Sequence, residues 1–171
     1  MDCSHFSHLV IQETMNEAYI KTVLTLFSTL TLLLLITSIL LFGTKIGFSL
    51  EDISNYYRGN EELFIVKKSF EGLLETTLPH LFSITTLIFI VIHLLLFTEY
   101  KKFVPYLLYG LLLSSVADLS SGYLLVANFT LFAVIKWVSF LIFEILFFIS
   151  IYLIILDIMR NKTLQISKDE F

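Results

Sequence analysis

Five ionisable side chains lie inside long apolar runs of the sequence: His80, His93, Asp118, Lys136 and Glu144. A charged group in hydrocarbon costs about 3 kcal/mol or more, so such residues usually form a buried pair or mark a site. Placed along their expected helices at about 1.5 Å per residue, they predict two layers. The outer layer is a buried polar cluster of His80, Asp118 and Lys136 with Ser121. The inner layer is a pair of His93 and Glu144.

Asp118 and Lys136 are expected to face each other, because only a short link separates the two apolar runs that carry them. The simplest interpretation of the two residues is a structural ion pair. Removing either partner would leave the other charge buried and uncompensated, which destabilises a fold strongly.

His80 and His93 also raise the hypothesis of a redox subunit that binds haem b, because membrane helix bundles often ligate haem through histidine. Their separation turns a helix by about 220°, so the two rings would lie on different faces. His8 is a third candidate ligand for haem or a metal, if the N-terminal segment folds back. Cys3 and His5 could join His8 in holding a soft metal, although a fourth donor is lacking nearby.

A proton or ion pathway is a second alternative, since the outer layer, the His93–Glu144 pair and intervening hydroxyls have the composition of a relay. The favoured hypothesis is a small accessory or anchoring subunit of a larger membrane complex. Such a protein would pack against other membrane subunits or against itself, and its long segment between the first two runs would contact the partner. The absence of a nucleotide-binding loop, a nucleophile elbow and a zinc-protease motif argues against an independent enzyme.

The elements that must position these residues are membrane helices. Hydrophobic residues make up 57% of the chain and charged residues 15%, which favours a single membrane domain, residues 1–171, surrounded by the lipid bilayer. A spanning helix needs about 20 mostly apolar residues. Four stretches qualify, at about residues 22–42, 77–97, 103–126 and 130–155. The expected fold is an all-α antiparallel bundle of four transmembrane helices.

The segment of about residues 43–76 should carry structure of its own. Ser49 followed by Asp52 is typical of a helix start, Gly59 of a helix end, and Ser69 of a second start that continues into the next span. We expect this segment to cover one mouth of the bundle. The first span shows no ionisable residue in its centre, and it is expected mainly to face lipid.

Basic residues suggest the orientation. Six lie on the side of the termini and four on the other side, and two of the six are in the short link Thr98–Lys102. The N-terminal segment 1–21 and the tail 156–171 are therefore expected in the cytoplasm, with the protein in a cytoplasmic or inner membrane. The net charge of −4 offers no basic face for nucleic acid.

Overall fold

The computed structural model describes the backbone of residues 3–127 and 129–169, and the side chains of residues 19–127 and 129–160. Its helices are α1 (Cys3–Lys45), α2 (Leu50–Arg58), α3 (Phe70–Leu96), a short 3-10 turn η1 (Lys101–Phe103), α4 (Val104–Val126) and α5 (Phe132–Asp169). Four of the described segments are long and apolar enough to span a membrane: Tyr19–Lys45, Phe70–Leu96, Lys101–Val126 and Phe132–Arg160. The expected all-α fold with four membrane helices is confirmed.

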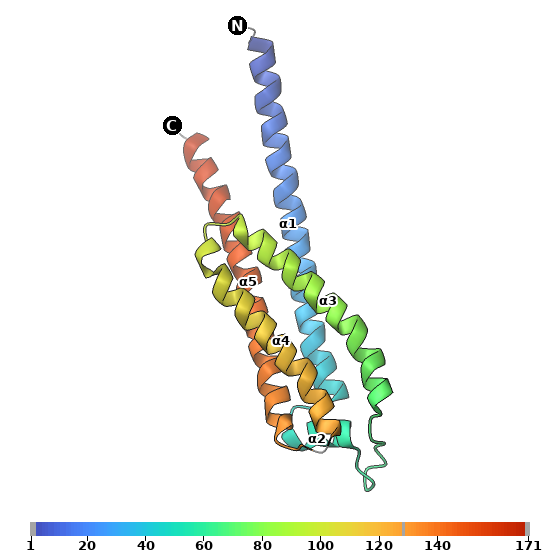
Figure 1. The fold of residues 1–171 in the computed structure, drawn as a ribbon. Coiled ribbons are helices and arrows are strands. Elements are labelled where there is room, and N and C mark those ends of the chain that lie inside the picture. The colour runs from blue at the N-terminus through green and yellow to red at the C-terminus, as the bar shows by residue number, and fades with distance from the viewer. Residues whose placement is uncertain (1–2, 128, 170–171) are drawn as a thin grey trace.

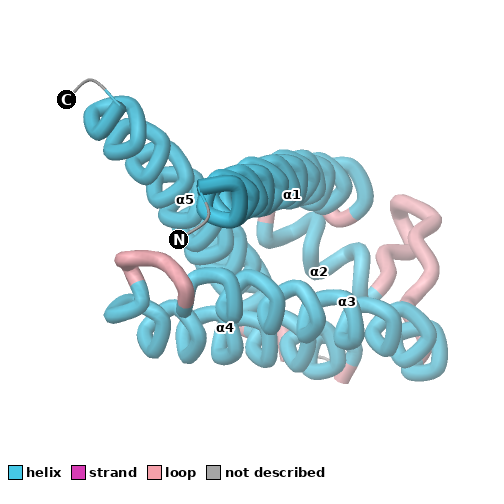
Figure 2. The backbone as a smooth tube through the Cα atoms, turned by 90° about the horizontal axis from the view of Figure 1, so that it is seen from above, coloured by secondary structure: helices cyan, strands magenta, loops and turns pink. Residues whose placement is uncertain are grey.

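The spans run antiparallel, and both chain ends lie at the end of the bundle that holds the α3–α4 turn (Figure 1). We call this end the terminal side. At the opposite end, the cap side, α2 lies across the bundle (Figure 1). Helix α5 is central because it packs against α1, α2, α3 and α4, whereas α1 packs chiefly against α5. Seen from above, α5 separates α1 from the α3–α4 pair (Figure 2).

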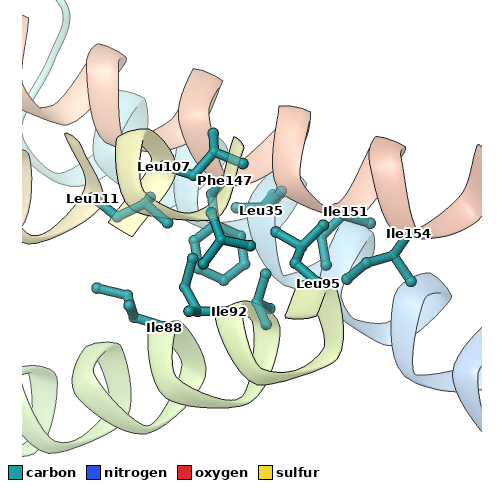
Figure 3. Close-up of a cluster of buried hydrophobic side chains, with 11 residues drawn as sticks. Leu35, Ile88, Ile92, Leu95, Leu107, Leu111, Phe147, Ile151 and Ile154 are labelled. Carbon is teal, nitrogen blue, oxygen red and sulfur yellow. The ribbon is translucent and has the colours of Figure 1, made fainter. Parts of the chain in front are cut away.

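Two apolar clusters hold these helices together. The larger one lies on the terminal side and takes buried side chains from all four spans (Figure 3): Leu35, Ile88, Val91, Ile92, Leu95, Val104, Leu107, Leu111, Phe147, Ile151 and Ile154. The second lies on the cap side and consists of Phe42, Ile53, Tyr57, Leu73, Leu125, Ala133 and Phe140. Lys136 lies between Ala133 and Phe140 of the cap-side cluster, whereas Glu144 lies between Phe140 and Phe147, where the two clusters meet.

Local sequence signals set the helix ends in the capping segment. The Ser49 hydroxyl accepts a hydrogen bond from the Asp52 amide at 3.0 Å and starts α2, and Ser69 does the same for the Gly72 amide at the start of α3. Gly59 ends α2 with φ +79°, a conformation that a side chain would strain. Helix α3 then continues without a break into the second span, with Pro79 inside it. This span therefore begins seven residues earlier than the expected residue 77.

The first span is mostly exposed, with 17% of its apolar window buried, and its buried face forms a seam with α5. Its buried positions Ser28, Thr31, Leu35 and Phe42 repeat at intervals of three and four residues, and Ser38 continues the same row half-buried. The Phe42 and Phe140 rings stack with centroids 4.1 Å apart, which fixes the antiparallel register of the two helices. One face of α1 is thus a row of hydroxyl residues, interspersed with Leu35 and Phe42, that packs on α5.

Candidate functional site

Asp118 of α4 and Lys136 of α5 form a buried ion pair on the cap side of the bundle. Lys136 Nζ lies 2.8 Å from Asp118 Oδ2, and it also donates to the Asp118 carbonyl oxygen at 3.1 Å. The two side chains are 10% and 18% exposed. Ser121 donates to the Asp118 carbonyl oxygen at 2.7 Å, so its hydroxyl supports the backbone beside the pair and does not contact the carboxylate.

Tyr57 of α2 covers this ion pair on the cap side. Lys136 Nζ lies 5.9 Å from the centroid of the Tyr57 ring, and the Tyr57 hydroxyl is within hydrogen-bonding reach of the ammonium group. Gly122 of α4 permits the contact, because a Cβ at that position would lie 3.2 Å from Tyr57 Cε1. Burial raises the pKa of the Tyr57 phenol, although the nearby Lys136 charge opposes the shift. The capping helix is therefore attached to the charged pair.

Some polar atoms near the cap side remain without hydrogen-bond partners. Asp118 Oδ1 and Trp137 Nε1 are both buried and unpaired. The carboxylate of Asp118 is consequently satisfied on one oxygen only. Lys136, in contrast, directs its ammonium group to a carboxylate oxygen, a carbonyl oxygen and a phenol.

Glu144 occupies a separate position on the α1–α5 seam. The residue is 6% exposed, and its Oε2 atom has no hydrogen-bond partner. Its side-chain neighbour on α1 is the Ser38 hydroxyl. The stacked pair Phe42–Phe140 explains this contact, because one helical turn back on α1 and one turn forward on α5 bring Ser38 opposite Glu144.

The two histidines do not join these buried groups. His80 is exposed on α3, where its Nδ1 atom lies 3.1 Å from the Thr76 carbonyl oxygen, so it is not a member of a buried cluster with Asp118 and Lys136. The early start of α3 also moves His80 to within about 5 Å of the middle of that helix. The reason for its exposure is that α3 packs on the bundle near Leu73 and again from Ile84 onward.

His93 likewise faces away from Glu144, and the expected inner pair is not formed. The His93 side chain is exposed and its ring lies between Phe89, at 5.8 Å, and Phe97, at 5.2 Å between centroids. Because α3 buries the opposite face there, His93 points outward while Glu144 points to α1. Neither histidine lies where a haem held between the helices would meet it.

The remaining metal hypothesis concerns Cys3, His5 and His8, whose side chains lie outside the described residues. Within the part of the chain that is described, no three His, Cys, Asp or Glu residues are grouped closely enough to hold a metal ion.

A shallow apolar groove of about 410 Å³ lies on the outward face of the α4–α5 hairpin. Its small wall residues are Gly110, Ser114, Ala117 and Ser139. Ser114 and Ser139 donate to carbonyl oxygens of their own helices, at 2.8 and 2.6 Å, so the groove presents hardly any free polar group. A Cβ on Gly110 would lie 2.6 Å from Leu146 Cδ1, so this glycine serves close packing of α4 on α5.

Residues 61–86, which we call the exposed segment, contrast with the rest of the molecule. All its residues are exposed except Leu73, which is buried, and Gly72, Thr77 and Ile84, which are partly buried. The segment begins with a tight hairpin in which Asn60 and Ile65 exchange backbone hydrogen bonds of 2.9 Å. Phe64 at the tip of the hairpin is 94% exposed and has φ +54°.

The exposed segment continues along α3 with polar side chains. Thr76, His80, Ser83 and Thr86 are all exposed on this helix. The outward faces of α4 and α5 are apolar over the same depth, with exposed residues such as Leu113, Val116, Ile142 and Ile145. Thr76 donates to carbonyl oxygens of its own helix at 3.1 and 3.0 Å, as the exposed Thr25, Thr29 and Thr37 of α1 do at 2.8 Å.

Four apolar spans, an intramembrane ion pair and outward-facing hydrocarbon side chains define an integral membrane protein in contact with the lipid bilayer. Residues 47–165 match the model of the family Aq_1264_TM, a transmembrane helical domain, from just before α2 into the last turns of α5. The chain belongs to this family. The comparisons with curated proteins and with solved structures found no match.

Sequence reasoning missed Ser38, and the expectation that the segment of residues 43–76 covers the mouth of the bundle is wrong at the hairpin tip, where Phe64 is exposed. The signal for Ser38 was the regular row of Ser28, Thr31 and Ser38 on the first span, at helical spacing. The signal for the tip was the apolar run Leu63–Val66 between two acidic and two basic residues. A run of this kind does not by itself distinguish a buried strand from an exposed tip.

Proposed function

We propose that this protein is an accessory subunit of a larger membrane complex and that its exposed segment, residues 61–86, binds the partner. The observation that carries the proposal is the hairpin tip. Leu63, Phe64 and Val66 are 59%, 94% and 84% exposed on a segment outside the four spans. Contiguous exposed apolar side chains at such a place favour a protein contact.

The backbone of Phe64 adds weight to this interpretation. A bulky residue in the left-handed region costs about 1 kcal/mol or more and is rare in ordinary turns. The Asn60 carboxamide oxygen accepts hydrogen bonds from the Glu62 and Leu63 amides, at 2.9 and 3.3 Å, and so fixes the turn that presents Phe64. Strain kept at an exposed aromatic tip, with no packing in return, is consistent with a role in recognition.

The polar stripe on α3 extends the same surface into the membrane. His80, Ser83 and Thr86 lie within about 5 Å of the middle of α3, where lipid offers them no hydrogen-bond partner. A transmembrane helix of a partner subunit with its own polar side chains would satisfy them. The partner would thus meet the hairpin tip outside the spans and the stripe of α3 inside them.

The orientation that we propose places the terminal side in the cytoplasm and the exposed hairpin outside it. The basic residues of the short α3–α4 link support this arrangement, because Lys101 and Lys102 are exposed there and positive charge favours the cytoplasmic side. The partner contact through the hairpin would then be extracytoplasmic.

The test compares Phe64→Asn with Leu50→Asn, a matched change at a 47% exposed residue on the cap side but outside the exposed segment. Asparagine tolerates the left-handed region, so Phe64→Asn should raise the stability of the isolated protein by about 1 kcal/mol. The same change should reduce co-purification of the partner from native membranes by at least tenfold, while Leu50→Asn leaves it unchanged. Equal recovery of partner subunits by wild type and Phe64→Asn would refute the proposal.

A further inference from the structure

We propose that Glu144 is a proton-binding site in the α1–α5 seam, and that release of its proton weakens the contact between these two helices. This inference does not depend on the accessory function, because it concerns a contact inside the chain. It rests on three properties of the seam: the burial of the carboxyl group, the neighbours that surround it, and the weak attachment of α1 to the remainder of the bundle.

The first property is burial without an opposite charge. Glu144 is 6% exposed, lies between Phe140 and Phe147 on the face of α5 that meets α1, and leaves Oε2 without a partner. An ionised carboxylate in such a place would lose its hydration and receive no cation in exchange. A neutral carboxyl group loses far less hydration than a carboxylate on burial, and the Ser38 hydroxyl of α1 lies beside it.

The second property is the identity of the neighbouring groups on every packed element. Along α1, the spanning residues between Lys21 and Lys45 contain no charged side chain. On α4 the nearest charge is Asp118, which is acidic and so opposes ionisation of Glu144. Lys136 on α5 is about 12 Å away along the helix axis and is already paired with Asp118. His80 and His93 of α3 are exposed and face elsewhere.

The third property is the way α1 is held. Helix α1 packs chiefly against α5, whereas α5 also contacts α2, α3 and α4. The seam in which Glu144 lies combines the hydroxyl residues Ser28, Thr31 and Ser38 of α1 with the apolar Leu35 and Phe42. A negative charge formed in this seam would therefore be relieved most easily by separation of α1 from α5 or by entry of water between them.

The pH dependence of the seam follows from the protonation state that the seam accepts. The folded seam accepts Glu144 in its neutral form, so its stability is present while the proton is bound and is lost as rising pH removes the proton. Glutamine has nearly the same shape and stays neutral at every pH. Glu144→Gln should therefore hold the seam closed where the wild type loosens.

The experiment is infrared difference spectroscopy of wild-type protein and Glu144→Gln in lipid vesicles, recorded over the pH range in which both remain folded. We expect the wild type to show the carbonyl stretch of a protonated carboxyl group that Glu144→Gln lacks. The band should disappear at high pH, and over the same interval the melting temperature of the wild type, but not of Glu144→Gln, should fall. Asp118→Asn, which removes the other intramembrane acid, should retain the Glu144 band.

Two results would overturn the proposal. Carboxylate bands in place of the carbonyl band, at every pH tested, would mean that Glu144 is ionised in the folded protein. A carbonyl band that persists at every pH would mean that the carboxyl group does not exchange its proton. Ser38→Ala checks the assigned neighbour, since loss of the hydroxyl should shift the carbonyl band while the band itself remains.

Discussion

The cap-side ion pair and the exposed segment both contain polar residues, but only those of the ion pair are enclosed by the rest of the chain. Asp118 and Lys136 are enclosed by α2, α4 and α5, and the lysine ammonium group is fully partnered within the chain. His80, Ser83 and Thr86 lie at a comparable depth on α3 and remain exposed. The comparison teaches that the chain itself encloses its polar groups in one region and leaves them exposed on its outer face in the other.

The difference has a physical origin in how the helices are connected. The α4–α5 hairpin has a very short link and packs along its whole length, and α2 is tied to the linked end. Helix α3 follows the hairpin of residues 60–65, and it packs on the bundle at Leu73 and again from Ile84 to Leu95. The first region should therefore respond to mutation through stability, and the second through partner binding. The following four experiments test that division.

The largest effect is expected for Lys136→Met. This change leaves the Asp118 carboxylate buried without its cation and should reduce the free energy of unfolding by about 3–5 kcal/mol. The double variant Asp118→Asn/Lys136→Met should recover most of the loss. Equilibrium unfolding in mixed micelles measures the stability of the single and the double variant, and Lys102→Met, at an exposed lysine, is the control. An unaltered stability of Lys136→Met would show that the ion pair contributes nothing.

Ile53→Ala should have the next largest effect. Ile53 of α2 is 0% exposed in the cap-side cluster, and truncation of such a side chain typically costs about 2–4 kcal/mol. The capping helix should become accessible to protease before the spans do. Leu50→Ala on the same helix removes a 47% exposed side chain and should change little. Similar losses for the two variants would mean that α2 is not docked as described.

Tyr57→Phe should cost about 1 kcal/mol, because it removes only the hydroxyl group near Lys136 and keeps the packed ring. The pKa of Tyr57 is raised by burial, so its contribution to stability is full below the ordinary phenol pKa of about 10 and declines above it. The stability gap between wild type and Tyr57→Phe should narrow in alkaline solution. Thermal unfolding at neutral and alkaline pH measures the gap, and a gap that widens would contradict the assigned contact.

Ser83→Ala and Thr86→Ala together should have the smallest effect on stability, within about 0.5 kcal/mol, because both side chains are exposed. Co-purification of the partner should nevertheless fall severalfold. Chemical unfolding and quantitative capture from native membranes separate the two effects. A large loss of stability would place these residues inside the fold, and unimpaired capture would remove the stripe from the interface.

Much of this architecture could be predicted from the sequence. Uninterrupted apolar runs specify membrane helices, and Ser49, Gly59 and Ser69 mark the ends of α2 and the start of α3 through short-range hydrogen bonds and backbone preference. Asp118 and Lys136 could be paired in advance because the chain between their helices is too short to separate them.

The position of each histidine could not be predicted in the same way. Depth along a helix follows from residue number, but the neighbour that a face meets depends on how adjacent helices tilt and part. His80 is exposed because the part of α3 between Leu73 and Ile84 does not pack on the bundle. His93 is exposed because the opposite face of α3 carries Ile88, Val91 and Ile92 into the core. Ser38 was overlooked for a related reason, since hydroxyl residues are common in spans and its importance appears only opposite Glu144.

Site-specific photo-crosslinking in native membranes is the most direct test of the proposed partner contact. A photoreactive amino acid is placed at Phe64 and Ser83 of the exposed segment, and for comparison at Leu113 and Ile145, which are 73% and 57% exposed on α4 and α5. We predict adducts with one membrane protein of different sequence at the first two positions and only lipid adducts at the other two. Adducts with lipid alone at all four positions, or with a second copy of this chain at the first two, would contradict the proposed accessory role.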